Sequence, residues 1–138
     1  DVINVSGHRF GTAEIESAIN QTSGVIESAV VGCEHEIKGQ GIYAFVICER
    51  AYEGSEALKM QSAIEAQVVL GIGKIARPDR IQIVEGLPKT RSGKIMRRIL
   101  RKIASGDYER FGDTSTLLDP SVVAGIVDQA RHLQSIEQ

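Results

Sequence analysis

The chain has 138 residues, of which 42% are hydrophobic and 25% charged, and its formal net charge is -2. These proportions are typical of one ordinary globular domain. No apolar run approaches the roughly 20 residues that a transmembrane helix needs, so such a helix is excluded. The slightly negative net charge argues against a protein held to nucleic acid by its overall charge. The start shows no signal-peptide pattern and is Asp1 rather than Met, so we expect a piece of a longer protein.

The first half of the chain predicts a hairpin, a helix and two strands. Residues 2–11 are rich in β-forming residues and contain two glycines, which predicts a tight hairpin. Apolar residues at helical spacing follow, and we expect Thr12 to cap a helix that ends near Gln21. The apolar runs at 25–33 and 41–48 predict strands covered on both faces.

The middle of the chain predicts a second helix and a third strand. The helix is expected over 55–70, with Leu58, Ile64 and Val68 turned inward. A short strand is expected over 80–84, after Pro78.

The last third predicts a loop over 86–94 and a helix over 95–104 with one apolar and one basic face. A polar tether at 112–116 and an amphipathic helix after Pro120 complete the chain. This order of elements predicts the α+β class: a small compact domain with a short N-terminal hairpin, a central three-stranded sheet flanked by helices, and a C-terminal helical tail. We expect residues 1–106 to form the main domain and residues 107–138 to form a tether and helix that pack on or near it.

The cysteines and histidines do not indicate a metal site. The spacing of His8, His35 and His132 is unlike that of metal ligands, and Cys33 and Cys48 fall in apolar runs as reduced core thiols would. Such sparse cysteine use is typical of a reducing compartment. We therefore expect a cytoplasmic protein, with an organelle matrix as the alternative.

A cluster of cations is the strongest anomaly of the sequence. Seven of the sixteen Lys and Arg residues fall within fourteen positions: Lys89, Arg91, Lys94, Arg97, Arg98, Arg101 and Lys102. The helix arginines alone are typical of a solvated polar face. The loop lysines indicate a surface that meets an anion.

Three kinds of anion site are possible for the loop. A P-loop is excluded because six residues separate Gly86 from Gly93 and because Ile95, not a hydroxyl residue, follows Lys94. Specific nucleic-acid binding is disfavoured because residues 86–104 contain no aromatic side chain, although a non-specific phosphate contact stays open. The third possibility is that Lys94 brings a cation to a charged transition state.

The hairpin offers a second candidate site. Ser6, Gly7, His8 and Arg9 place a hydroxyl, a bare backbone, an imidazole and a guanidinium side by side. Gly7 permits a ligand to approach the main chain closely, and the planar fork of Arg9 suits a phosphate. The alternative is a simple polar turn.

Several segments resemble the C-terminal domain of the acetyl-coenzyme A synthetases, within the adenylate-forming superfamily. The segments are residues 1–9, 11–16, 38–43 and 87–98, the last containing Pro-Lys-Thr-Arg-Ser-Gly-Lys. The tail at 112–123 narrows the resemblance to acetyl- or propionyl-CoA synthetases. The resemblance implies a two-step ligase that forms acetyl-adenylate from acetate and ATP, with Mg²⁺ accompanying ATP, and then transfers the acetyl group to coenzyme A. A propionate ligase and a non-catalytic phosphate-binding module are the alternatives.

The resemblance also implies roles for individual residues. This domain would be a lid that rotates against a large N-terminal domain, and Lys94 would be its adenylation lysine. Lys94 would also be the site of regulatory acetylation, by a protein acetyltransferase and a deacetylase. Ser6 and Gly7 would border coenzyme A, and Arg9 would contact nucleotide phosphate. No nucleic-acid or membrane partner is implied.

The chain departs from the family pattern at three places, one of which, the basic Arg77 before Pro78, has no consequence of its own for the site. Relatives carry basic residues near the end of the second helix, where one meets a phosphate of coenzyme A, but this chain has apolar residues around Val69. Lys74 or Arg77 is the candidate replacement. Relatives also hold a cation on backbone carbonyls after the first helix, but residues 20–25 differ in type here, and no metal site is assigned.

Overall fold

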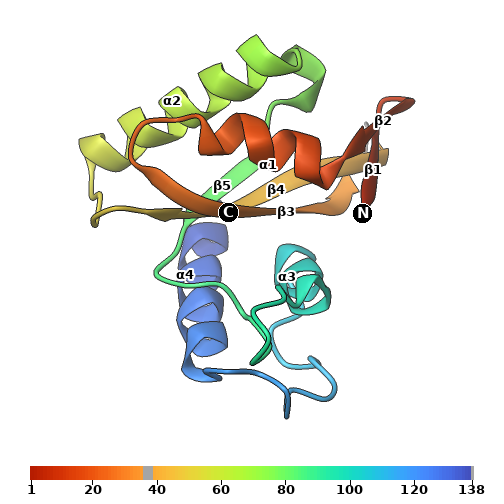
Figure 1. The fold of residues 1–138 in the computed structure, drawn as a ribbon, viewed down its shortest axis with the longest axis vertical. Helices are drawn as coiled ribbons and strands as arrows, with labels where there is room; N and C mark the ends of the chain where they lie inside the picture. Colours follow the sequence, from red (N-terminus) through yellow and green to blue (C-terminus); the bar gives the residue numbers. More distant parts are fainter. Residues whose placement is uncertain (36–38, 138) are drawn as a thin grey trace.

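The computed structural model describes residues 1–35 and 39–137, and it confirms the α+β class. One sheet and four α-helices make up the fold (Figure 1). In chain order the elements are β1 (Val2–Val5), β2 (His8–Gly11), α1 (Thr12–Asn20), β3 (Val25–His35), β4 (Gly39–Cys48), α2 (Ser55–Gly71), a 3₁₀ turn (Lys74–Ala76), β5 (Arg80–Ile83), α3 (Arg97–Ala104) and α4 (Ser121–Glu137).

The sheet has five strands, because the N-terminal hairpin joins the three central ones. β4 is antiparallel to β3 along its whole length. On its other side, β4 pairs with β1 only at Val5 and Gly39, and then with β5 over Tyr43 to Val46. β5 runs parallel to β4, since α2 carries the chain back to the same end before β5 begins. The hairpin is thus fixed to the start of β4.

Helices cover both faces of the sheet, as the continuous apolar runs predicted. α1 and α2 lie on one face, and α3 and α4 on the other (Figure 1). Side chains alternate between the faces with the period of a strand. Val30 and Ala44 therefore pack with α1 and α2, whereas Ala29, Val31 and Phe45 pack with α3 and α4.

Two details of the helices differ from the expectation. Thr12 is the first residue of α1 and is buried, while Gly11 holds the cap position without a side-chain hydrogen bond. The Thr12 amide instead donates to the Asp1 carbonyl. On α2, Leu58 is 64% exposed. The buried line of α2 runs through Met60, Ile64 and Val68, and Leu58 lies two residues, or about 200°, from Met60 around the helix.

A buried glutamine connects α4 to the sheet. The Tyr43 hydroxyl donates to Gln82 Oε1 over 2.7 Å, and Gln82 Nε2 donates to the Ile126 carbonyl over 3.0 Å. Val123, Ile126 and Ala130 of α4 are buried against the same face. Within the described part of the chain, neither α4 nor any other helix has the length and apolar character needed to cross a membrane.

Candidate catalytic and ligand-binding loops

Lys94 is held at the end of a hydrogen-bonded turn. The Gly93 amide donates to the Thr90 carbonyl over 2.9 Å, and the Thr90 amide donates to the Lys94 carbonyl over 2.9 Å. The Lys94 amide also donates to Thr90 Oγ1 over 3.2 Å. Gly93 has a φ of +88°, which the turn requires and which a side chain would strain. Gly93 is thus part of an ordered turn.

The same turn shortens the helix that follows it. Ile95 forms an antiparallel bridge with Lys89, and the Met96 amide donates to the Pro88 carbonyl over 2.8 Å. These contacts keep residues 95–96 out of the helical conformation, so α3 begins at Arg97 instead of Ile95. Lys94 therefore stands three residues ahead of a fixed helix.

Most of the cluster of cations is engaged within the domain. Four members form ion pairs, Lys89 with Glu27, Arg97 with Glu16, Arg101 with Asp1 and Lys102 with Asp107. Arg98 donates to the carbonyls of Phe111 and Asp113. The interpretation of Arg97 and Arg98 as a solvated face was wrong. Their partners lie 13 to 81 positions away in the chain, where a local charge pattern gives no signal.

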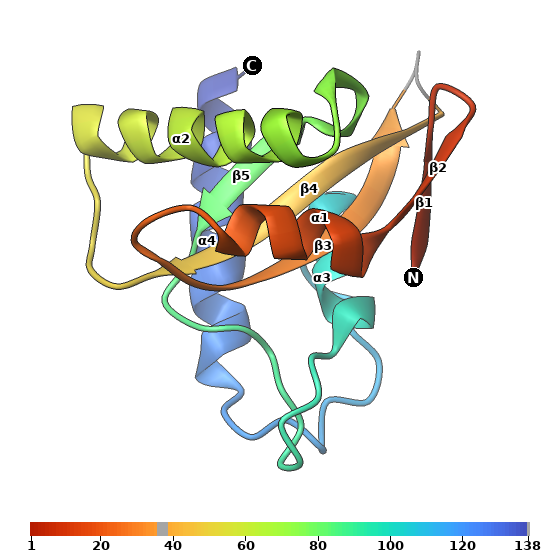
Figure 2. The same cartoon turned by 45° about the horizontal axis from the view of Figure 1, so that its top comes forward.

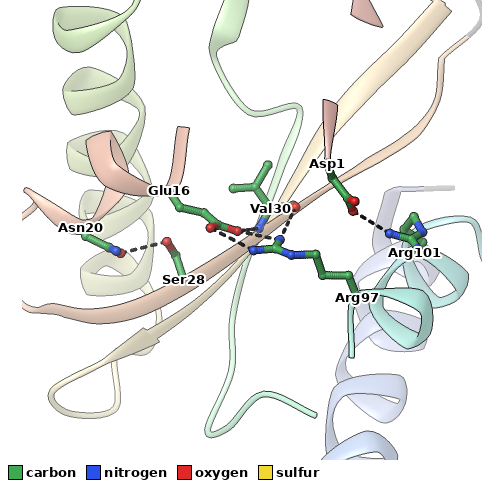
Figure 3. Close-up of polar contacts among 7 residues, drawn as sticks. All are labelled: Asp1, Glu16, Asn20, Ser28, Val30, Arg97 and Arg101. Atoms are coloured by element: carbon green, nitrogen blue, oxygen red, sulfur yellow. Dashed lines mark hydrogen bonds and ion pairs between the residues drawn. The ribbon is translucent and has the colours of Figure 1, made fainter. Parts of the chain in front are cut away.

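Arg97 joins the two helical layers at the side of β3 (Figure 3). Its guanidinium lies 2.7 Å from the Glu16 carboxylate of α1 and donates to the Val30 carbonyl over 2.9 Å. Glu16 in turn accepts from the Val30 amide over 2.8 Å. The side chains of Arg97 and Glu16 are only 24% and 13% exposed, so the pair is shielded from water.

Replacing Arg97 with Met is expected to lower the free energy of unfolding by about 2 kcal/mol, because it leaves a shielded carboxylate and a carbonyl without their donor. Urea unfolding of this chain measures the change. Arg101→Met is the matched control on the same helix: its ion pair with Asp1 is nearly half exposed, and its loss should cost less than about 1 kcal/mol. Equal losses would mean that the shielding of Arg97 contributes nothing.

Two cations of the cluster remain available to a ligand. Arg91 and Lys94 are exposed, and among the described residues neither side chain has an assigned hydrogen bond or ion pair. Both lie on the turn at residues 90–94. The positive charge that can meet an anion is therefore concentrated at this turn.

The hairpin loop has a strained backbone. Ser6 and Gly7 have φ angles of +50° and +83° between the paired residues Val5 and His8, as a type I′ turn requires. Within the described ranges, Ser6 is the only residue other than glycine with a positive φ. Both residues are exposed, and a Cβ added to Gly7 would meet no atom within 4 Å. The main chain is thus open to a ligand at this loop, as the sequence suggested.

A cleft of about 540 Å³ brings Ser6 together with the two candidate replacement cations. Its lining includes Val5 and Ser6 of the hairpin, Lys74 of the 3₁₀ turn, and Arg77. Asp79 also lines the cleft, and its carboxylate accepts from the Ile42 amide over 2.7 Å. Arg9 lies on β2, where it pairs with Asn4, and is not part of this lining.

The two candidate loops lie at opposite ends of the molecule. In Figures 1 and 2 the turn that precedes α3 lies far below the sheet, whereas the β1–β2 loop lies at the upper right. In both views α3 lies between them. Within this domain, Lys94 and Gly7 cannot contact one small ligand at the same time.

The cysteines are partly buried, whereas His8 is exposed. Both cysteines are half-buried reduced thiols, and burial, with a smaller effect of Glu49, raises the pKa of Cys48. His8 lies on the exposed hairpin with Nδ1 3.3 Å from the Ser6 carbonyl. The side chain of His35 lies outside the described residues. No group of three or more His, Cys, Asp or Glu side chains suited to a metal occurs in the parts of the chain that the structure describes.

Comparison with known proteins identifies the family. Residues 14–94 match the family described as "AMP-binding enzyme C-terminal domain". The chain is 59% identical over 128 residues to acetyl-coenzyme A synthetase 2 of Pseudomonas aeruginosa, covering 93% of this chain and 20% of that protein. It is 57% identical over 132 residues to acetyl-coenzyme A synthetase of Alcanivorax borkumensis, covering 96% of this chain and 20% of that protein.

Solved structures agree with this assignment. The crystal structure of a Brucella canis acyl-CoA synthetase superposes with a TM-score of 0.67 at 39% identity, over 74% of this chain and 18% of that one. The chain spans about a fifth of the length of the curated relatives that it matches. From the matched residues and the shared fold, we conclude that the chain belongs to the AMP-binding enzyme C-terminal domain family.

Proposed function

We propose that this chain is the mobile C-terminal domain of an AMP-forming acetate–CoA ligase in the cytoplasm. In this proposal residues 1–106 form a lid on a large N-terminal domain, and residues 107–138 form a tether and helix packed against the lid. The observation that carries the proposal is the identity of 55–59% to relatives named acetyl-coenzyme A synthetase, over nearly the whole chain. Lys94, which is exposed and has no assigned partner among the described residues, agrees with it.

In the first half-reaction, an acetate oxygen attacks the α-phosphorus of ATP, and the bond to pyrophosphate breaks. Lys94 is assigned to stabilise the negative charge between the acetate carboxylate and the α-phosphate. A solvent-exposed lysine has a pKa of about 10.4 and is a cation at neutral pH, so it suits charge stabilisation and not proton abstraction. Arg9 is assigned to a nucleotide phosphate. Mg²⁺ enters with ATP, and no residue of this chain is assigned as its ligand.

In the second half-reaction, the thiol of coenzyme A attacks the acetyl carbonyl, and AMP leaves as the thioester forms. Ser6 and Gly7 are assigned to the wall of the pantetheine path. Lys74 and Arg77 line the same cleft as Ser6, which supports them as the cations that meet a phosphate of coenzyme A. They would replace the basic residues that the end of α2 lacks.

The separation of the two loops supports a domain that works in two orientations. One orientation would bring Lys94 to the adenylate, and the other would bring the hairpin to it. Because Lys94 is exposed, it is also open to a protein acetyltransferase. Acetylation removes its charge, and a deacetylase would restore it.

The test is an assay of the full-length parent enzyme for acetate-dependent release of pyrophosphate, followed by CoA-dependent formation of acetyl-CoA. Propionate is the second substrate to compare, because the acyl pocket lies outside this chain. Preference for acetate supports the proposal, and preference for propionate would identify a propionate–CoA ligase instead. If neither acid leads to release of pyrophosphate, a non-catalytic phosphate-binding module is favoured.

The isolated chain is expected to fold but to form no adenylate. Its two apolar clusters provide a core on each face of the sheet, whereas the acyl pocket is expected in the N-terminal domain. Thermal unfolding should be cooperative, and no pyrophosphate should be released from ATP and acetate. Turnover by the purified chain would contradict this division between domains.

A further inference from the structure

A segment beyond the matched family region is paired with the Lys94 turn. We call residues 111–118 the strap; they follow α3 and precede α4. Leu117 forms an antiparallel bridge with Thr90, and the Leu118 amide donates to the Lys89 carbonyl over 2.9 Å. The strap therefore adds an extended segment to one arm of the turn, whose other arm carries Lys94.

Arg98 fixes the opposite end of the strap. Its guanidinium donates to the carbonyl of Phe111 and, over 2.7 Å, to the carbonyl of Asp113. Gly112 lies between them with a φ of +70°, and a Cβ there would stand 3.3 Å from Arg98 Nη1. The Asp113 carboxylate accepts from the Ser115 amide over 2.9 Å, and hydrogen bonds from Ser115 hold the pKa of Asp113 below its usual value.

The strap packs on α4 mainly at Leu117, which is 4% exposed and lies in the same apolar cluster as Val123 and Val127. Beside this contact a groove of about 630 Å³ runs between the strap and α4, lined by Phe111 and Thr114 among others. The part of the strap before Leu117 is therefore only partly packed on α4. Arg98 holds that end, whereas Leu117 and the pairing with Lys89 and Thr90 hold the other.

We propose that the strap positions the Lys94 turn for adenylation and that Arg98 is a positioning residue for this half-reaction. Arg98 follows Lys94 by four residues. The short segment 94–98 therefore carries both the Lys94 amine and the guanidinium that holds the strap. Lys94 is assigned to the first half-reaction only. Loosening the strap should then slow adenylation and leave the hairpin at the other end of the domain unaffected. The proposal rests on the function proposed above.

The experiment uses the full-length enzyme with Arg98→Ala, Arg98→Lys and a control, Arg110→Ala. The Arg110→Ala substitution removes the same charge beside the strap. The Arg110 side chain has no assigned contact among the described residues. In Arg98→Ala, adenylation kcat should fall about 10- to 100-fold, as for a misplacement of about 1 Å. KM for ATP and thioester formation from supplied acetyl-adenylate should change little. Lysine carries the charge without the planar fork, so Arg98→Lys should recover only part of the rate.

Hydrogen exchange on the same proteins gives a readout that does not depend on turnover. Amides of residues 88–96 should exchange faster in Arg98→Ala than in the wild type, and should be unchanged in Arg110→Ala. Unchanged exchange, or equal slowing of both half-reactions, would overturn the proposal. If Arg98→Ala does not fold, Arg98→Lys decides by the same criteria, since it keeps the charge but cannot donate to both strap carbonyls through a planar fork. If the wild type forms no acetyl-adenylate, the proposed function fails, and hydrogen exchange alone decides whether the strap holds the turn.

Discussion

Lys94→Ala in the full-length enzyme is expected to slow acetyl-adenylate formation by about 10² to 10³-fold, or about 3 to 4 kcal/mol of transition-state stabilisation. Lys94 is exposed on an ordered turn and has no assigned partner in the described chain, so its removal disturbs no internal contact. Thioester formation from supplied acetyl-adenylate should persist, because the turn lies at the end of the domain opposite the hairpin. Rapid-quench measurement of each half-reaction separates the two rates.

Arg91→Ala is the matched control for this prediction. Arg91 is the other exposed cation of the same turn, and its loss removes equal charge without removing the amine assigned to the reaction. It should reduce adenylation by much less than Lys94→Ala. Equal slowing of both half-reactions by Lys94→Ala would favour a single shared site over a rotating domain.

Gly7→Leu is expected to give the reverse pattern. A leucine side chain at the exposed loop would obstruct the path assigned to pantetheine, and kcat/KM for coenzyme A should fall about 10- to 100-fold, or about 1.4 to 2.7 kcal/mol. Acetate-dependent pyrophosphate release should persist, because Gly7 is far from Lys94. Stopped-flow thioester formation with varied coenzyme A measures the change.

Gly7→Ala provides the control for backbone strain. Gly7 has a φ of +83°, and any Cβ there costs about 1 to 2 kcal/mol. Alanine carries this cost without the bulk, and no atom lies within 4 Å of its Cβ position. If alanine impairs thioester formation as much as leucine does, strain in the hairpin, and not obstruction, explains the loss.

Local patterns predicted the elements and the exposed candidates well. The apolar runs of β3 and β4 are covered on both faces because their side chains alternate between two helical layers. The β-forming residues and two glycines of residues 2–11 predicted the hairpin that exposes Gly7. Lys94 was singled out by its motif, and the structure leaves it on an exposed turn.

Features that depend on distant residues could not be predicted in this way. Arg97 was taken for a surface residue because its partners, Glu16 and Val30, are 81 and 67 positions away. The joining of the hairpin to the sheet through Gly39 depends on how β4 is placed in space. Residues 112–116 of the strap have the composition of a polar tether, and only contacts with distant residues, Lys89, Thr90 and Arg98, distinguish the strap from one.

The contacts at Val30 have a consequence for how this domain meets other chains. β3 is the last strand of the sheet order, and a terminal strand with unpaired amides and carbonyls is a template for intermolecular β-pairing and aggregation. Glu16 takes the outward amide of Val30 and Arg97 its outward carbonyl, so a carboxylate and a guanidinium occupy the positions that a neighbouring strand would fill. Two residues earlier on β3, the Ser28 hydroxyl donates to Asn20 Oδ1 of α1 over 2.8 Å. At Val30 the outer edge of the sheet is thus blocked against the addition of a foreign strand.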